Sequence, residues 1–140
     1  MPPSVHIRVG IDILAVERVS RLLRENDGIE DEVFTPRELD YCRGRSRPDE
    51  HLAARFAAKE AVLKVIGTGL SRRLRWTDVE ILRDRAGRPE VQLHGRLAAF
   101  AGTQGITDID VSLSHSGGLA VAQAAAICDS GGGDASCAST

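Results

Sequence analysis

Hydrophobic and other residues alternate near the start of the chain. Every second residue there is a branched aliphatic one: Val5, Ile7, Val9, Ile11 and Ile13. A period of two is typical of a β-strand, whose successive side chains point to opposite faces. The pattern therefore predicts a strand over residues 5–13, with Asp12 near its end on the face opposite the aliphatic stripe.

Apolar residues at helical spacing follow directly and predict a helix that ends near residues 26–28. A second helix is expected to begin at Thr35, because proline and glutamate follow it at the positions of a capping box. A longer helix is predicted over residues 50–66. It is expected to end at Gly67, since glycine readily adopts the backbone conformation that terminates helices.

The rest of the chain is predicted to contain a hairpin, a short helix and two strands: residues 79–82 and 91–93, residues 96–101, and residues 109–113 and 119–127. Antiparallel strands with helices between them, without regular βαβ alternation, predict an α+β fold. One domain is expected over residues 1–128. The Gly- and Ser-rich residues 129–140 are expected to form a disordered tail.

Composition narrows the function classes. The chain has 140 residues, a net charge of −2 and only 4% aromatic residues, which argues against nucleic-acid binding. No apolar run is long enough to span a bilayer, and no signal pattern for export is present at the start. The three cysteines, Cys42, Cys128 and Cys137, are far apart and are interpreted as free thiols. A cytoplasmic location is therefore expected.

The long central helix carries the first candidates for chemistry. Phe56, Glu60 and Lys64 are spaced four residues apart and share one helix face. Glu60 and Lys64 form either a surface ion pair, worth roughly 0.2–0.5 kcal/mol, or a carboxylate for a hard cation beside an ammonium for a phosphate. Asp12 is either the second carboxylate of such a cation site or a turn or helix-capping residue. Taken alone, the residues leave both alternatives open.

Arginine dominates the basic residues, since only Lys59 and Lys64 of the 18 are lysines. The arginines group in three places: Arg18, Arg21 and Arg24; Arg43, Arg45 and Arg47; and Arg72, Arg73 and Arg75. A guanidinium group binds phosphate oxygens in pairs, but arginines are also common on solvated surfaces. The first group indicates either a docking face for an acidic partner or a solvated helix face. The role of the third group stays open.

A Ser-His segment near the end of the fold is a weaker candidate. Ser112 and Ser114 are predicted to share one strand face, with His115 just past the strand. The chain has no GxSxG elbow, which argues against a serine hydrolase. His115 is interpreted either as a phosphate donor or as an ordinary polar residue.

Several motifs together resemble the holo-acyl-carrier-protein synthases, the small class of 4′-phosphopantetheinyl transferases. The motifs are Val9-Gly10-Ile11-Asp12, Phe34-Thr35-Pro36-Arg37-Glu38, residues Arg55 through Lys64, Gly67-Thr68-Gly69, Gly87-Arg88-Pro89 and Ser112-Leu113-Ser114-His115. The segment from Arg55 to Gly69 is the most specific of them. The resemblance covers roughly residues 5–127.

The resemblance implies a compact α+β subunit that forms a homotrimer and binds coenzyme A between neighbouring subunits. It implies Mg²⁺ on Asp12 and Glu60, Lys64 on the substrate phosphates, and an acidic acyl carrier protein as partner. The residues implied to bind coenzyme A are Arg55, Lys64, Gly67, Gly69 and His115, and those implied to dock the carrier are Arg18, Arg21 and Arg24.

The expected reaction is Mg²⁺-dependent transfer of 4′-phosphopantetheine from coenzyme A to a carrier serine, with release of adenosine 3′,5′-bisphosphate. Asp12, Glu60 and Lys64 are expected to be catalytic. The general base stays open between a metal-bound water, Glu60 and His115. The carrier type, whether fatty-acid, polyketide or peptide-synthetase, also stays open. The alternative activity is a Mg²⁺-dependent hydrolase of the coenzyme A pyrophosphate.

Overall fold

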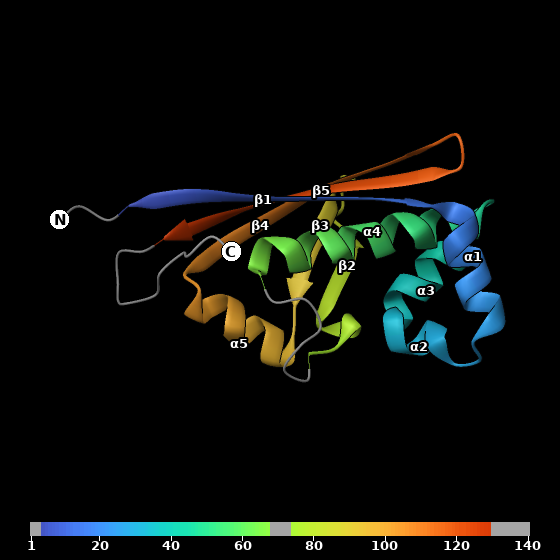
Figure 1. Cartoon of the computed structure of the whole chain (residues 1–140), viewed down its shortest axis with the longest axis horizontal. Helices are drawn as coiled ribbons and strands as arrows, with labels where there is room; N and C mark the ends of the chain where they lie inside the picture. The colour runs from blue at the N-terminus through green and yellow to red at the C-terminus, as the bar shows by residue number, and fades with distance from the viewer. Residues whose placement is uncertain (1–3, 68–73, 130–140) are drawn as a thin grey trace.

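A computed structural model describes residues 4–67 and 74–129, and the structural statements below concern these residues. The elements are β1 (Val5–Ala15), α1 (Val16–Glu25), α2 (Ile29–Val33), α3 (Pro36–Arg43), α4 (Pro48–Ile66), the 3-10 helix η1 (Trp76–Asp78), β2 (Val79–Arg83), β3 (Pro89–Leu93), α5 (Gly95–Thr103), β4 (Ile106–Ser116) and β5 (Leu119–Asp129). Figure 1 shows α4 running beneath a sheet, with α1, α2 and α3 at one end and α5 below the other end; the β2–β3 hairpin runs behind α4, and its strand β3 reaches β4 of the sheet.

The sheet has the order β1-β5-β4 with antiparallel neighbours, and β2 and β3 form a separate antiparallel hairpin. The face of β5 that meets α4 consists of small buried residues: Ala120, Ala122, Ala124, Ala126 and Cys128. The facing helix is also rich in buried alanines, including Ala57 and Ala61. Small side chains on both surfaces let the helix and the sheet approach closely, so α4 is buried on most of its circumference.

The predicted α+β class and its main elements are confirmed. Thr35 caps α3 through the expected capping box, and Gly67 ends α4 with a φ of 88°. The short α2 and η1 were not predicted, because five- and three-residue helices give little periodic signal. It was wrong to place His115 beyond its strand, since β4 extends through Ser116 along its pairing with β5.

Two further expectations need correction. Asp129 was assigned to a disordered tail but is the last residue of β5, paired with Val5; residues 130–140 lie outside the described residues. Cys42 is a buried free thiol, whereas Cys128 is disulfide-bonded, so the prediction of three free thiols was wrong. Distance along a sequence does not limit how closely cysteines approach in a fold. No helix among the described residues is long and apolar enough to cross a bilayer.

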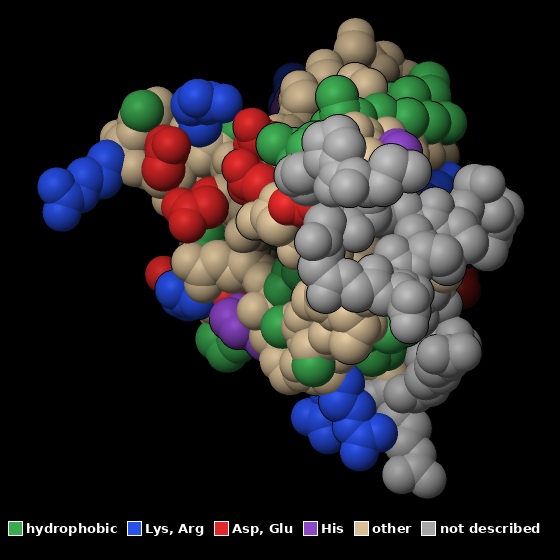
Figure 2. Space-filling model, turned by 90° about the vertical axis from the view of Figure 1, so that its left-hand side faces the viewer, with side chains coloured by type: hydrophobic (Ala, Val, Ile, Leu, Met, Phe, Trp, Pro, Cys, Tyr) green, Lys and Arg blue, Asp and Glu red, His purple; other side chains and the backbone are tan. Residues whose placement is uncertain are grey.

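The aliphatic stripe of β1 lies on the outer face of the sheet and is exposed. Its side chains are 61–74% accessible: Val5, Ile7, Val9, Ile11 and Ile13. Leu119 and Ile127 of β5 are also exposed large hydrophobic residues. Figure 2 shows hydrophobic side chains gathered near the top of the molecule, where the sheet lies. Exposed apolar faces of this kind are common where proteins contact other molecules.

A buried ion pair joins α3 to α4. Lys59 and Glu38 are fully buried, and Lys59 Nζ lies 2.7 Å from Glu38 Oε1. Lys59 also donates to the carbonyl oxygens of Val79 (2.6 Å) and Trp76 (3.2 Å). Glu38 accepts from the backbone N–H of Ile81 at 2.9 Å. The pair therefore connects both helices to the start of the hairpin.

Glu80, which directly precedes Ile81 on β2, is the centre of a second polar cluster. Its carboxylate, 3% exposed, accepts hydrogen bonds from Thr35 Oγ1 (2.5 Å) and Arg37 Nη2 (2.5 Å), and it contacts His94 Nε2 (2.9 Å). Burial raises the pKa of Glu80, but the hydrogen bonds from Arg37, Thr35 and His94 outweigh it and lower the pKa from 4.5 to about 2.

We expect Glu80→Gln to lower the free energy of unfolding at pH 7 by about 2–3 kcal/mol, because a depressed carboxyl pKa stabilises the fold wherever the group is ionised. This contribution is complete above the unfolded pKa of 4.5 and is lost as the pH falls through about 2. Urea unfolding of both proteins between pH 7 and pH 2 measures it. A difference that did not shrink in acid would contradict the assignment.

Candidate functional site

A cavity of about 620 Å³ lies where the end of β1 meets α1 and α4. Its polar lining residues are Asp12, Arg18, Arg21, Glu60 and Lys64, with Asn26 and Glu25 at the end of α1. Phe56, Glu60 and Lys64 all line it, which confirms that they share one face of α4. The structure thus brings together five of the charged residues singled out in the sequence.

Lys64 pairs with Asp12 across the cavity. Its Nζ lies 3.3 Å from Asp12 Oδ1 and donates to the backbone oxygen of Ile11 at 2.8 Å. The side chain of Asp12 is 18% exposed and that of Lys64 is 53% exposed. The ion pair that Lys64 makes is therefore with β1 and not with Glu60, one turn earlier on its own helix. This contact ties the end of β1 to α4.

Glu60 is electrostatically strained. Burial raises its pKa above the usual 4.5, and the negative charge of Asp12 raises it further, while Lys64 and Arg18 act in the opposite direction. A hard cation bound between two carboxylates would relieve the repulsion between them. Mg²⁺ takes one or two carboxylates plus water and phosphate oxygens. Among the described residues no group of three or more His, Cys, Asp or Glu is placed to hold a metal. The two carboxylates therefore fit Mg²⁺ with water or substrate oxygens completing its shell.

The three arginines of α1 differ in their surroundings. Arg18 and Arg21 line the cavity beside Glu60. Arg24 Nη2 instead lies 3.0 Å from Glu17 Oε1, in an exposed ion pair. Arg18 and Arg21 are thus the members of the group that reach the rim of the cavity.

A second cavity, of about 250 Å³, opens beside the first half of α4. His51, Arg55, Arg83 and His115 line it. His115 Nδ1 lies 3.3 Å from Glu50 Oε2, and the rings of His51 and His115 meet edge to face at 5.7 Å. His115 and Arg55 therefore line one cavity, but not the cavity that holds Asp12 and Glu60.

Three arginines lie close to the ring of Tyr41, and two of them, Arg55 and Arg83, line this second cavity. The guanidinium carbons of Arg45 and Arg55 lie 4.3 Å from its ring centroid, and that of Arg83 lies 5.3 Å away. Arg55 is 1% exposed, and its buried Nε has no hydrogen-bond partner among the described residues. Such a concentration of positive charge is suited to an anion.

No sequence pattern predicted Tyr41, His51 and Arg83 at or beside this cavity, because they are single residues on α3, α4 and β2 that only the tertiary fold brings together. Arg55 and Glu60 are five positions apart on α4, so they point about 140° apart around the helix axis. Gly67 lies at the C-terminal end of α4. Gly69, Arg72 and Arg73 lie outside the described residues.

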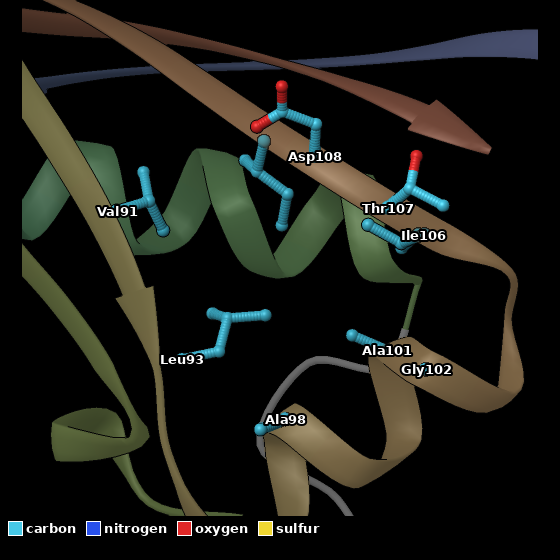
Figure 3. A pocket seen from close by; sticks show the side chains of 9 residues that line it. Val91, Leu93, Ala98, Ala101, Gly102, Ile106, Thr107 and Asp108 are labelled. Carbon is cyan, nitrogen blue, oxygen red and sulfur yellow. The ribbon is translucent and has the colours of Figure 1, made fainter.

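A third cavity, of about 260 Å³, lies between β3, α5 and β4. Figure 3 shows Val91, Leu93, Ala98 and Ala101 around it, with the carboxylate of Asp108 turned away from these side chains. Asp108 is the sole ionisable residue among those that line it. This cavity lacks the paired charged groups of the other two and is not a candidate for catalysis.

Comparisons with known proteins assign the chain to a family. Residues 8–124 match the family model of the 4′-phosphopantetheinyl transferase superfamily. The chain is 46% identical to a holo-[acyl-carrier-protein] synthase of Geotalea daltonii over 114 residues, which covers 81% of this chain and 91% of that protein.

Solved structures give the same assignment. A holo-ACP synthase from Plasmodium yoelii has a TM-score of 0.76 at 33% identity and covers 89% of this chain and 98% of its own. The Chronobacterium ammoniagenes ACPS–CoA complex has a TM-score of 0.74 at 30% identity and covers 86% and 96%. The chain therefore belongs to the 4′-phosphopantetheinyl transferase superfamily, among the holo-[acyl-carrier-protein] synthases.

Proposed function

We propose that this enzyme transfers 4′-phosphopantetheine from coenzyme A to a serine of an apo acyl carrier protein, with Mg²⁺ held by Asp12 and Glu60. The observation that carries the proposal is the single cavity in which these two carboxylates meet Lys64 and the arginines of α1. The related Chronobacterium ammoniagenes enzyme, solved as a complex with CoA, supports coenzyme A as the substrate.

The residues of the cavity suit phosphoryl transfer, which depends mostly on positioning and charge neutralisation. When bound, Mg²⁺ would neutralise charge on the pyrophosphate and stabilise the leaving group. Asp12 and Glu60 would hold it, and Lys64 would give up its ion pair with Asp12 to contact a phosphate oxygen. Arg18 would reduce the repulsion between Glu60 and its neighbours.

In the proposed reaction the serine oxygen of the carrier attacks the phosphorus next to pantetheine. The bond from that phosphorus to the bridging oxygen breaks, and adenosine 3′,5′-bisphosphate leaves with the bridging oxygen. The serine loses its proton as the new phosphodiester forms. Of the two candidate bases in the protein, Glu60 lies in the cavity and His115 lies in the second one, which favours Glu60 within one chain.

We propose that the second cavity binds the 3′-phosphate of coenzyme A, because the pyrophosphate belongs at the metal and one further phosphate remains. Arg55 supplies a buried guanidinium with an unused donor, and His115 supplies an imidazole oriented by Glu50. Gly67 and Gly69 are proposed to lie along the same substrate. An Arg-lined pocket of this kind favours a dianionic phosphate over a neutral hydroxyl.

We also propose a homotrimer. The exposed aliphatic face of β1 provides an apolar surface for a second copy. One chain carries the carboxylate pair and the arginine cluster in separate cavities, so a molecule as long as coenzyme A suits a site that neighbouring subunits complete together. Light scattering should give three chain masses, and a stable, active monomer would contradict the proposal.

The transfer itself is tested by mass spectrometry. Incubation with coenzyme A, Mg²⁺ and an apo carrier should raise the carrier mass by one phosphopantetheine and release adenosine 3′,5′-bisphosphate. The alternative, a Mg²⁺-dependent hydrolase of the pyrophosphate, predicts cleaved coenzyme A and an unchanged carrier. A panel of fatty-acid, polyketide and peptide-synthetase carriers would also identify the preferred partner. Cytoplasmic location stays a prediction.

Reversing the charge of the cavity arginines should weaken carrier docking. We expect Arg18→Glu and Arg21→Glu each to raise the carrier KM by roughly tenfold, with a smaller change in the coenzyme A KM, because a basic rim speeds the encounter with an acidic partner. Arg24→Glu is the matched comparison, since Arg24 pairs with Glu17 away from the cavity and should have less effect. Equal rises in both KM values would remove the docking role.

A further inference from the structure

β1 contacts the backbone of α4 at Gly10, and the missing side chain permits this contact. A Cβ placed there would lie 2.4 Å from the carbonyl oxygen of Ala61. It would also lie 3.1 Å from Cγ2 of Val65 and 3.2 Å from Cβ of Lys64. Gly10 is not among the described glycines with positive φ. The position therefore requires glycine for space and not for a special backbone conformation.

The helix has little freedom to retreat from an added methyl group. Ala61 is 0% exposed and Val65 is 2% exposed, and α4 is packed between the sheet and the hairpin. Because a close-packed core transmits strain instead of absorbing it, β1 would move by roughly half an ångström or more. The movable partner is thus the strand that carries Asp12.

The contact lies between the two proposed metal ligands. Asp12 is two residues beyond Gly10 on the same face of β1, and Glu60 directly precedes Ala61 on α4. Lys64, whose Cβ would lie against a side chain at position 10, also donates to the backbone of β1 at Ile11. Any displacement of β1 from this turn of α4 would therefore change the separation of the two carboxylates.

Arg8 fixes the strand on the other side of the contact. Its Nη1 donates to the carbonyl oxygens of Val65 (3.2 Å) and Ile66 (3.4 Å), in the last turn of α4. With the strand held at Arg8, a methyl group at Gly10 would lift the end that carries Asp12. Arg8, Gly10 and Asp12 thus form one seam along the inner face of β1.

We propose that Gly10 is a positioning residue that sets the spacing of Asp12 and Glu60 for a cation the size of Mg²⁺. This role rests on the metal site proposed above. Mg²⁺ demands near-ideal octahedral geometry with ligands at about 2.0–2.1 Å, whereas Ca²⁺ accepts flexible geometry at about 2.3–2.6 Å. A wider pair should therefore weaken Mg²⁺ binding more than Ca²⁺ binding.

The experiment measures metal binding directly. Electron paramagnetic resonance of free Mn²⁺ gives its binding to the full-length protein, and displacement by Mg²⁺ and Ca²⁺ gives their Kd values. For Gly10→Ala we expect the Mg²⁺ Kd to rise about tenfold and the Ca²⁺ Kd by less than about threefold, since sub-ångström misplacement at a strict site is costly. Gly102→Ala is the control, because a Cβ there meets nothing within 4 Å.

Two outcomes would overturn the role of Gly10: unchanged Kd values in a folded Gly10→Ala variant, or equal losses for both ions. If that variant does not fold, Arg8→Met tests the role of Gly10 instead. It weakens the attachment of β1 to α4 without adding volume at Gly10, and it should raise the Mg²⁺ Kd more than the Ca²⁺ Kd. Asp12→Asn separates the two proposals. Wild-type Mn²⁺ binding in Asp12→Asn would overturn the metal site itself.

Discussion

Asp12→Asn and Glu60→Gln are each expected to lower kcat/KM for carrier modification by at least about a thousandfold, because each removes a full charge from the proposed cation site while keeping the shape of the side chain. The two carboxylates act on one ion, so the double variant should lose little more than either single variant. Carrier mass gain per unit time, measured at several Mg²⁺ concentrations, gives the comparison.

The fold should survive these changes. Glu60 has a raised pKa because burial and Asp12 disfavour its charge, so neutralising it relieves repulsion in the unliganded protein. We therefore expect Glu60→Gln to unfold at the same temperature as the wild type or slightly above it. Glu90→Gln, an exposed carboxylate on β3, is the matched control and should keep full activity. Near-normal transfer by either site variant at low Mg²⁺ would show that the metal assignment is wrong.

Local patterns in the sequence predicted most of the fold. The alternation in β1, the capping box at Thr35 and the glycine after α4 are each signals carried by adjacent residues, and the structure confirms all three. The side of β1 that is buried was not apparent from the alternation. The strand turns Gly10 toward α4 and leaves its aliphatic stripe exposed, because the helix and the alanine-rich face of β5 leave room for little more than glycine.

In the candidate site, too, local spacing predicted some features and the tertiary fold determined the others. Glu60 and Lys64 share a helix face, as their spacing predicts, but Lys64 pairs with Asp12, a residue 52 positions away. Only the tertiary fold determines that partner. The arginine cluster around Tyr41 is a stronger case, since its members come from three different elements and an intervening loop, and no spacing rule connects them.

Lys59→Met should separate stability from catalysis. Lys59 is fully buried against Glu38, and removing one partner of a buried pair leaves an uncompensated charge that typically costs about 3–5 kcal/mol. Burial already lowers the pKa of Lys59, with Glu38 acting against that shift, so the ammonium depends on its partner. We expect the unfolding midpoint to fall by roughly 10 °C or more for a chain of this length. Circular dichroism at fixed protein concentration measures it.

Lys64→Met is the matched control, because it makes the same substitution on the same helix at a side chain that is 53% exposed. An exposed ion pair contributes at most about 1 kcal/mol, so this variant should unfold near the wild-type temperature while losing most of its transfer activity. Replacing both Lys59 and Glu38 with apolar residues should cost less than the sum of the single losses, since the unpaired charge disappears with its partner. A Lys59→Met protein as stable as Lys64→Met would mean that the buried pair of Lys59 and Glu38 contributes nothing to folding. Lys59 would then need a role in the reaction.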